Sequence, residues 1–296
     1  MFPVDIWENS IGRNDMTRPC RRNPLDAPHN AMADMQIVWI NAGDKFEELA
    51  IPSAGQEVVA GVPWGAVDQF YTAAFWKCQT ELHVRKNQYT SHQLGRNLTE
   101  EVAVCLLGGY GIPAEMGLLA FDRLRAQDLL KPGISEIVLQ EQLAEPFCIG
   151  GKSRRYRFHS QKARYLSLCL AALEDIPTDC SDLELREALM GLPGIGPKTA
   201  SWIVRNHRCS DSVAIIDIHL HRAGQIMGLF PQNSEPTRDY LKLEASFLDL
   251  CLAIAVKASV LDALIWDYMR RAGPTSGLTA PAKQKSYQST QLALAI

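Results

Sequence analysis

Two side chains, a lysine and an aspartate nineteen positions apart, suggest the chemistry that this chain can do. Lys198 directly follows the segment Leu192–Pro197 (LPGIGP), and Asp217 lies in the apolar segment Val213–His219 (VAIIDIH). A glycine-containing hairpin between two helices, an amine at the start of the second helix and one carboxylate downstream form a compact set. This combination indicates binding to a DNA backbone and attack of the amine on a sugar carbon.

The hairpin has the residue types that a phosphate-binding turn needs. Gly194 and Gly196 flank Ile195, and glycine permits a tight turn whose backbone N–H groups are not shielded by side chains. The N-terminus of the following helix adds a partial positive charge, which favours an anion. Ile195 is expected to pack back between the helices. A plain helix–helix connection is the alternative for this turn.

Lys198 can act as a nucleophile only when its amine is neutral. The ordinary pKa of lysine is about 10.4, so near neutral pH the neutral form costs roughly 4 kcal/mol. Burial in an apolar pocket or a nearby helix N-terminus reduces that cost, and we therefore predict that Lys198 is mostly enclosed. Asp217 would stabilise positive charge that develops on the sugar and would also cap a helix. A plain helix cap is the alternative for Asp217.

These residues must be positioned by a chain that is mainly helical. Apolar spacing and capping pairs predict helices, and two β-branched segments predict a small N-terminal strand element. The predicted helices are 98–107, 114–130, 155–173, 183–190, 198–207, 241–256 and 259–271, and the predicted strands are 35–41 and 56–62. We divide the chain into an N-terminal extension (1–60), a main domain (61–272) and a tail expected to be disordered (273–296).

Composition restricts the function further. The chain has 296 residues, 47% of them hydrophobic and 21% charged, with a formal net charge of -3. Any DNA binding must therefore come from a local basic patch rather than from overall charge. We find no signal peptide and no transmembrane segment and expect a cytoplasmic protein. The eight cysteines contain no C-x-x-C pair, which predicts reduced thiols and neither a zinc site nor an iron–sulfur cluster.

Two segments carry a resemblance to a known family. Leu192–Asn206 (LPGIGPKTASWIVRN) followed by Val213–Arg222 (VAIIDIHLHR) resembles the helix-hairpin-helix DNA glycosylase superfamily. Lys198 and its distance from Asp217 resemble the 8-oxoguanine DNA glycosylase/AP lyase branch most. The endonuclease III branch usually has four C-terminal cysteines for an iron–sulfur cluster, and here only Cys251 follows Cys209. The adenine-excising branch lacks the lysine.

The resemblance implies a fold and further site residues. It implies two helical subdomains with the helix-hairpin-helix between them and a DNA cleft. His219 would face a phosphate, although a surface role is its alternative. Trp202 would line the base pocket, where it is bulkier than the family leads us to expect, or else belong to the core. Tyr110 and Ile112, on a glycine-broken turn, would fill the gap left by the extruded base. Burial of these large side chains between the helices is the alternative.

A basic segment provides a second possible DNA contact. Six cations fall within residues 152–164, among them Arg154 and Arg155, which we expect to contact the DNA backbone. A solvated helix face is the alternative. Together with the hairpin, this segment predicts a log–log salt slope of roughly -3 to -5.

The sequence thus predicts a base-excision DNA glycosylase with AP lyase activity, acting through a lysine Schiff base on an oxidised or modified base such as 8-oxoguanine. Two alternatives stay open: a glycosylase for another modified base, as in defence against foreign DNA, and a non-catalytic DNA-binding scaffold. The partner would be double-stranded DNA with a damaged or modified base, with no membrane involved. We expect a monomer, nucleoid-associated if prokaryotic. No cofactor is expected, apart from a monovalent cation that the hairpin carbonyls could hold.

Overall fold

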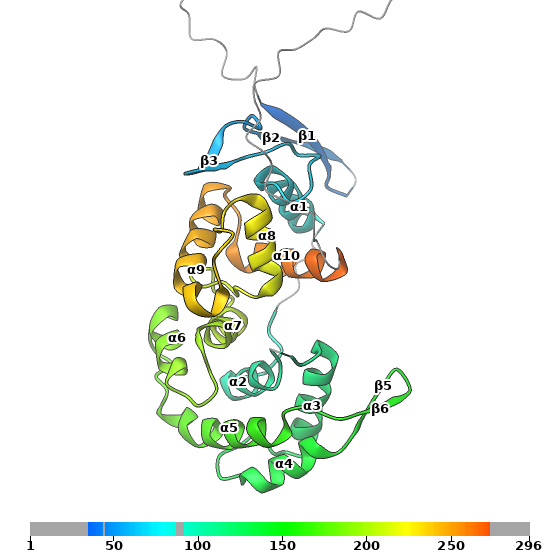
Figure 1. Cartoon of the computed structure of the whole chain (residues 1–296), viewed down its shortest axis with the longest axis vertical. Coiled ribbons are helices and arrows are strands. Elements are labelled where there is room, and N and C mark those ends of the chain that lie inside the picture. The colour runs from blue at the N-terminus through cyan, green and yellow to red at the C-terminus, as the bar shows by residue number, and fades with distance from the viewer. Residues whose placement is uncertain (1–34, 44, 87–91, 110, 273–296) are drawn as a thin grey trace, which may run out of the picture. The chain divides into compact units, whose positions relative to one another are not determined.

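The structure is a computed structural model that describes residues 35–43, 45–86, 92–109 and 111–272. In these residues it is mostly helical, as the sequence predicts (Figure 1). The helices are α1 (Ala73–Arg85), α2 (Leu98–Leu107), α3 (Ala114–Ala126), α4 (Glu136–Ala144), α5 (His159–Ala172), α6 (Asp182–Met190), α7 (Pro197–Arg208), α8 (Ile218–Met227), α9 (Pro236–Ala253) and α10 (Ala258–Ala272).

The strands form three separate antiparallel pairs. They are β1 (Gln36–Asn41) with β2 (Phe46–Ile51), β3 (Glu57–Val59) with β4 (Val62–Pro63), and β5 (Phe147–Ile149) with β6 (Lys152–Arg154). The predicted N-terminal strand element is therefore present, but β2 was not predicted, and the predicted strand 56–62 is divided into β3 and β4. Ile40, Leu49 and Ile51 are buried and pack into the same core as α1.

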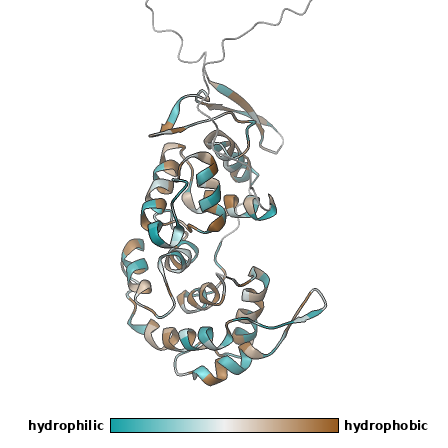
Figure 2. Cartoon of the chain, viewed as in Figure 1, coloured by the Kyte–Doolittle hydropathy of each residue, from teal (hydrophilic) through white to brown (hydrophobic). Residues whose placement is uncertain are grey.

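The buried side chains form two hydrophobic cores. The first core contains buried residues between Val102 and Val213, and the second contains those of 40–76 and 214–269. The chain therefore passes from one core to the other before α2 and again between Val213 and Ala214. Hydrophobic and hydrophilic residues alternate along the helices in Figure 2, as expected for helices that pack by one face. The hairpin with Lys198 and the segment that leads to Asp217 both lie close to this second passage.

Helix starts were predicted well where a capping side chain is present. The Asn97 side chain accepts a hydrogen bond from the Glu100 backbone N–H at 2.9 Å, at the start of α2. Ser181 and Glu184 form a complete capping box at the start of α6. The predicted helix 155–173 was wrong at its start, because Lys152–Arg154 pairs with Phe147–Ile149 and α5 begins only at His159.

The predicted domain boundaries at residues 60 and 272 stay a prediction. The described strands and helices belong to one compact unit that begins at Gln36. Within the part of the chain that the structure describes, no helix has the length and apolar character needed to cross a membrane.

Candidate active site

The loop between α6 and α7 is a tight hairpin held against α5. Gly194 has a φ of +78°, a conformation that favours glycine. A Cβ atom at Gly194 would lie 2.2 Å from Cδ2 of Tyr165, so the backbone passes directly over that ring. Ile195 is only 4% exposed and packs into the first core, as predicted. The turn is therefore fixed by packing against Tyr165 of α5 and against the first core.

Gly196 leaves the outer side of the hairpin open. It is the N-cap of α7 in an extended conformation, and a Cβ atom there would meet nothing within 4 Å. No side chain caps this helix, and Pro197 at its start has no N–H. The first N–H groups after Pro197 are therefore available to an anion at the positive end of the helix.

Lys198 lies in the first turn of α7 and is half-buried. This partial burial agrees with the prediction of a mostly enclosed Lys198, although the first turn of α7 lies at the open edge of the hairpin. A second lysine is its neighbour: Nζ of Lys162 donates to the carbonyl of Leu106 at 2.6 Å. Burial lowers the pKa of Lys162, and the positive charge of Lys198 lowers it further. Two amines therefore share this region, and the charge of Lys198 disfavours protonation of Lys162.

Asp217 caps α8, as predicted. Its Oδ1 accepts hydrogen bonds from the N–H groups of His219 and Leu220, both at 2.9 Å. Because both cap bonds use Oδ1, the cap does not need Oδ2. The carboxylate is half-buried. Asp217 can therefore cap the helix and still direct one oxygen at positive charge on a substrate.

A buried carboxylate, Glu244 of α9, joins the elements that carry Lys198 and Asp217. Its Oε1 accepts from the hydroxyl of Ser201 on α7 and from the N–H of Ala214, both at 3.0 Å. Its Oε2 forms a buried ion pair with Arg186 of α6. Ser201 lies three residues after Lys198, and Ala214 lies three residues before Asp217. Glu244 therefore fixes the two candidate catalytic segments relative to each other.

A second buried carboxylate, Asp262 of α10, lies close to Asp217. It accepts from the N–H of Ile215 at 3.2 Å and pairs with Arg205 at 3.2 Å. Burial raises its pKa to about 6, and the negative charge of Asp217 contributes to this rise, against the opposite effect of Arg205. Two carboxyl groups with different environments thus lie near the start of α8.

Two tryptophans border this region. Trp202 packs against the first core, and its ring passes so close to Gly108 that a Cβ atom there would lie 3.1 Å from Cη2. Trp266 of α10 meets the ring of His219 edge-on, at 6.4 Å between centroids and 87° between planes. Nδ1 of His219 is buried, and no described residue forms a hydrogen bond with it. Trp202 therefore lies beside the segment with Lys198, and Trp266 lies beside the segment with Asp217.

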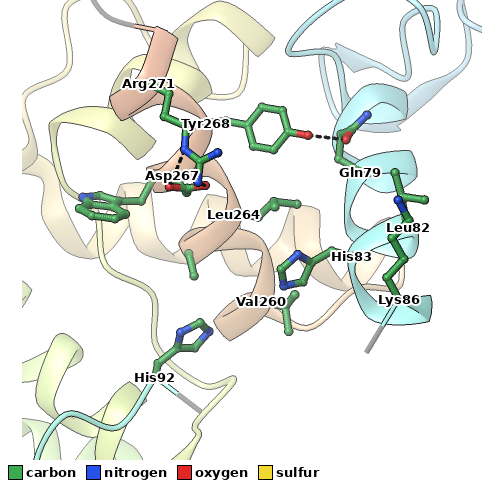
Figure 3. A pocket seen from close by; sticks show the side chains of 12 residues that line it. Gln79, Leu82, His83, Lys86, His92, Val260, Leu264, Asp267, Tyr268 and Arg271 are labelled. Carbon is green, nitrogen blue, oxygen red and sulfur yellow. Dashed lines mark hydrogen bonds and ion pairs between the residues drawn. The ribbon is translucent and has the colours of Figure 1, made fainter. Parts of the chain in front are cut away.

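Trp266 also lines a cavity of about 500 Å³ between α1 and α10 (Figure 3). Polar groups surround it, and Tyr268 donates to Gln79 at 2.6 Å while Arg271 pairs with Asp267. The remaining lining residues are Leu82, His83, Lys86, His92, Val260, Ala263 and Leu264. Burial, followed by the charges of Arg205 and His83, lowers the pKa of His92 to about 4, so this ring is neutral at physiological pH. The cavity therefore offers aromatic faces, a neutral imidazole, and charged groups of which Asp267 and Arg271 are paired with each other.

Comparison with known proteins identifies the family. A family model described as 8-oxoguanine DNA glycosylase matches residues 82–256, which is more than half of the chain. The chain belongs to this family. The match includes the whole helix-hairpin-helix, Lys198, Asp217 and most of the two cores, so the resemblance noted in the sequence is confirmed.

Several relatives of the 8-oxoguanine DNA glycosylase family support this assignment. A Saccharolobus islandicus protein named 8-oxoguanine DNA glycosylase/AP lyase is 34% identical over 126 residues, which cover 39% of this chain and 60% of that protein. A Metallosphaera sedula protein of the same name is 33% identical over 120 residues, covering 39% and 59%. The chain thus spans about 60% of the length of these curated relatives.

A solved structure supports the fold. The crystal structure of the Methanocaldococcus jannaschii 8-oxoguanine DNA glycosylase superposes with a TM-score of 0.53 at 22% identity, covering 68% of this chain and 94% of that one. The prediction of a mainly helical glycosylase fold is therefore confirmed.

The predicted wedge residues do not both fit a wedge in this member of the 8-oxoguanine DNA glycosylase family. Ile112 is buried in the first core and only 9% exposed, so it has no free side chain to insert into DNA. The prediction for Ile112 was wrong, because the glycine-broken turn directs this side chain inward. Tyr110 lies outside the described residues.

The basic segment has a different structure from the one predicted. Arg154 ends β6 and Arg155 follows it, and both are exposed. Only Lys162 and Arg164 of the six cations lie on α5. The cations therefore do not form one helix face, and most of them lie on a hairpin and the link after it.

Sequence reasoning missed three residues of this region: Glu244, Asp262 and Trp266. Each lies in a helix that apolar spacing had assigned to the core, and each meets the site only through tertiary contacts. One available signal was the spacing of Asp262 and Trp266, which places an acid and an aromatic ring one helical turn apart on α10. Among the described residues, no group of three or more His, Cys, Asp or Glu side chains could hold a metal ion.

Proposed function

We propose that this chain is a DNA glycosylase with AP lyase activity that removes 8-oxoguanine from duplex DNA. The observation that carries the proposal is the placement of Lys198 and Asp217 on segments that share one buried anchor, Glu244. Membership of the 8-oxoguanine DNA glycosylase family and the names of the relatives support the same activity. The open hairpin at Gly196 would hold a phosphate of the DNA.

The reaction begins with the neutral amine of Lys198. Its lone pair attacks C1′ of the damaged nucleotide, which has left the base stack, and the C1′–N9 bond breaks as the base departs with the bonding electrons. Asp217 stabilises positive charge on the sugar while that bond breaks. Opening of the sugar ring leaves a Schiff base between Nζ and C1′. Loss of a proton from C2′ then expels the 3′ phosphate and nicks the strand.

A second amine, that of Lys162, lies beside Lys198. Nζ of Lys162 donates to the carbonyl of Leu106 at 2.6 Å, and burial followed by the positive charge of Lys198 lowers the pKa of Lys162. Because the neutral amine is the form that attacks, Lys162 is the competing nucleophile from which Lys198 must be distinguished.

Trp266 is the side chain best placed to stack on the extruded base. It lines the cavity between α1 and α10 and touches His219, two residues beyond Asp217. A cavity of about 500 Å³ lies in the size range of small-molecule sites. Trp202, beside Lys198 on α7, would border the same nucleotide from the other core.

The direct test is borohydride trapping during turnover. The wild type, incubated with a duplex containing one 8-oxoguanine, should form a covalent protein–DNA adduct, and Lys198→Gln should form none. Lys162→Gln is the matched control, because it removes a neighbouring amine, and it should still form the adduct. Adduct formation by Lys198→Gln together with its loss in Lys162→Gln would assign the nucleophile to Lys162 instead.

The base itself needs a separate test. A panel of duplexes, each with one modified base, should give fastest release from 8-oxoguanine. Faster release of another base would favour the alternative of a glycosylase for a different modification. Binding without release from any duplex would favour the non-catalytic scaffold.

A further inference from the structure

The segment from Phe147 to Ala172 contains no carboxylate. It carries six cations and one histidine, on a chain whose formal net charge is -3: Lys152, Arg154, Arg155, Arg157, His159, Lys162 and Arg164. Such a local excess of one sign creates an attractive field for a polyanion even though the whole protein is slightly acidic.

The first part of this segment is the β5–β6 hairpin, which extends away from α3 and α4 (Figure 1). Its turn is Gly150–Gly151, and both residues have positive φ, +57° and +73°. This is the backbone geometry of a tight two-residue hairpin turn. In its three pairs Phe147 opposes Arg154, and Ile149 opposes Lys152 at the tip.

One arginine of α3 fixes the base of this hairpin. The guanidinium of Arg123 lies 3.5 Å over the ring of Phe147. It also donates to the carbonyls of the chain that enters β5, those of Gln142 at 2.7 Å and of Glu145 and Pro146 at 2.9 Å each. Arg123 therefore fixes the position at which the hairpin begins relative to α3.

The outer strand and the link after it present cations to solvent. Lys152, Arg154, Arg155 and Arg157 are all exposed. Across the residues that the structure describes, none of these four forms an ion pair, whereas Arg125 and Arg238 have carboxylate partners. Four unpaired charges of one sign repel one another, and an anionic partner would relieve that repulsion.

The link that follows β6 adjoins the edge of the candidate active site. A Cβ atom on Gly111 would lie 3.5 Å from the ring of Phe158 and 4.0 Å from Nη1 of Arg157. Gly111 belongs to the turn that follows α2, and Gly108 at the start of that turn lies against Trp202. The cations therefore begin beside the turn next to the active site and continue outward to the hairpin tip at Lys152.

We propose that the β5–β6 hairpin is an arm that binds the sugar–phosphate backbone of duplex DNA on one side of the damaged base, whether or not a lesion is present. The inference rests on the proposed function for the position of the damaged base. At about 3.3 Å per residue the arm reaches about 10–13 Å from its root, which corresponds to about three or four base pairs. Because the arm leaves from one edge of the site, only one DNA flank should meet it.

The test compares two triple variants with the same loss of charge. Lys152→Gln/Arg154→Gln/Arg155→Gln removes the arm's cations, and Lys45→Gln/Arg238→Gln/Lys242→Gln removes three exposed cations elsewhere. Dissociation constants are measured with undamaged and 8-oxoguanine duplexes whose flanks are shortened from either end. Thermal melting checks that both variants fold, and Lys152→Arg/Arg154→Lys/Arg155→Lys should restore binding because it keeps the charge.

The wild type should lose about tenfold in affinity when one flank is shortened and should be insensitive to shortening of the other. The arm variant should bind the long duplex about tenfold more weakly, with a log–log salt slope less negative by about 2 to 3, and should ignore both flanks. The enzyme concentration that gives half of the maximal rate of base release should rise by about the same factor of ten.

Equal behaviour of the arm variant and the control variant, or equal sensitivity of the wild type to both flanks, would overturn the proposal. The readouts separate it from the proposed function. Absence of base release by the wild type would contradict the glycosylase, while one-sided flank dependence of binding would still support the arm.

Discussion

The two candidate catalytic side chains belong to different halves of the molecule and are positioned by different means. Lys198 begins α7, whose Ala200, Ile203 and Val204 are buried in the first core. Asp217 begins α8 at the edge of the second core, after a segment whose N–H groups are bound by side chains of α9 and α10. The lysine is thus positioned by apolar packing and a glycine turn, whereas the aspartate is positioned by buried hydrogen bonds.

This difference indicates which parts of the site tolerate change. Apolar packing is spread over many contacts, so one substitution in it leaves the others in place. A buried polar network fails when one member is removed, because the remaining groups keep their desolvation cost without their partners. The relative position of the two halves should therefore be more sensitive to Glu244 than to any single apolar residue.

Removal of Glu244 should have the largest effect. Glu244→Ala leaves Arg186 buried without its partner and frees Ser201 and the N–H of Ala214, so we expect a loss of about 3–5 kcal/mol in the free energy of unfolding. Glu187→Ala is the matched control, since Glu187 also pairs with Arg186 but is exposed, and it should cost less than about 1 kcal/mol. Urea denaturation measures both. Similar losses would mean that the buried network does not join the halves.

Asp217→Asn should come next and tests the half that carries the acid. Asparagine caps a helix as well as aspartate does, so stability should change by less than about 0.5 kcal/mol. Loss of the negative charge should slow base release by about 100-fold or more under single-turnover conditions. Asp211→Asn is the control, because Asp211 also acts on the pKa of Asp262 yet binds the N–H of Ser259, and it should leave the rate within about twofold.

Gly194→Ala should give a smaller effect and tests the half that carries the lysine. The added Cβ would meet the ring of Tyr165, and φ is +78°, so we expect a loss of about 2 kcal/mol in the free energy of unfolding and weaker DNA binding. Gly196→Ala is the control, because its φ is -94° and the space around it is open. It should change stability by less than about 1 kcal/mol. Equal losses from both would show that contact with Tyr165 does not shape the turn.

The difference between local packing at Lys198 and long-range hydrogen bonds before Asp217 also explains what the sequence could predict. The first half follows local signals: the capping pair at Asn97, the capping box at Ser181 and the glycines of the hairpin all act within a few residues. Asp217 was predictable as a cap for the same reason. Glu244 and Asp262 were not, because their partners lie between 30 and 58 residues away and only tertiary packing brings them together.

Two errors have a local cause. The predicted helix began at Arg155, yet Gly150 and Gly151 form a hairpin turn that pairs the preceding residues, and α5 begins only at His159. The glycine pair directly after the apolar segment Phe147–Ile149 was the signal for this turn. Ile112 was predicted as a wedge residue from the family resemblance, with burial as the alternative, and its apolar side chain belongs to the first core.

The smallest effect concerns the segment where the chain first passes from the second core to the first. His92 lies there, and burial, followed by the charges of Arg205 and His83, lowers its pKa to about 4. In the unfolded chain the imidazole binds a proton below about pH 6.5, whereas in the folded protein it does so only near pH 4. The folded protein should therefore lose stability as the pH falls from about 6.5 to about 4.

His92→Gln should remove part of this loss. Because His92 is only partly buried, we expect the wild type to lose about 1 kcal/mol more than the variant between pH 7 and pH 5, measured by urea denaturation. An NMR titration of the imidazole should place its midpoint near pH 4. Equal losses in both proteins, or a midpoint near 6.5, would mean that the two cores do not enclose this side chain. The passage before α2 would then be open to water, and the contacts of Glu244 and the Asp262–Arg205 pair would be the buried polar links between the two halves.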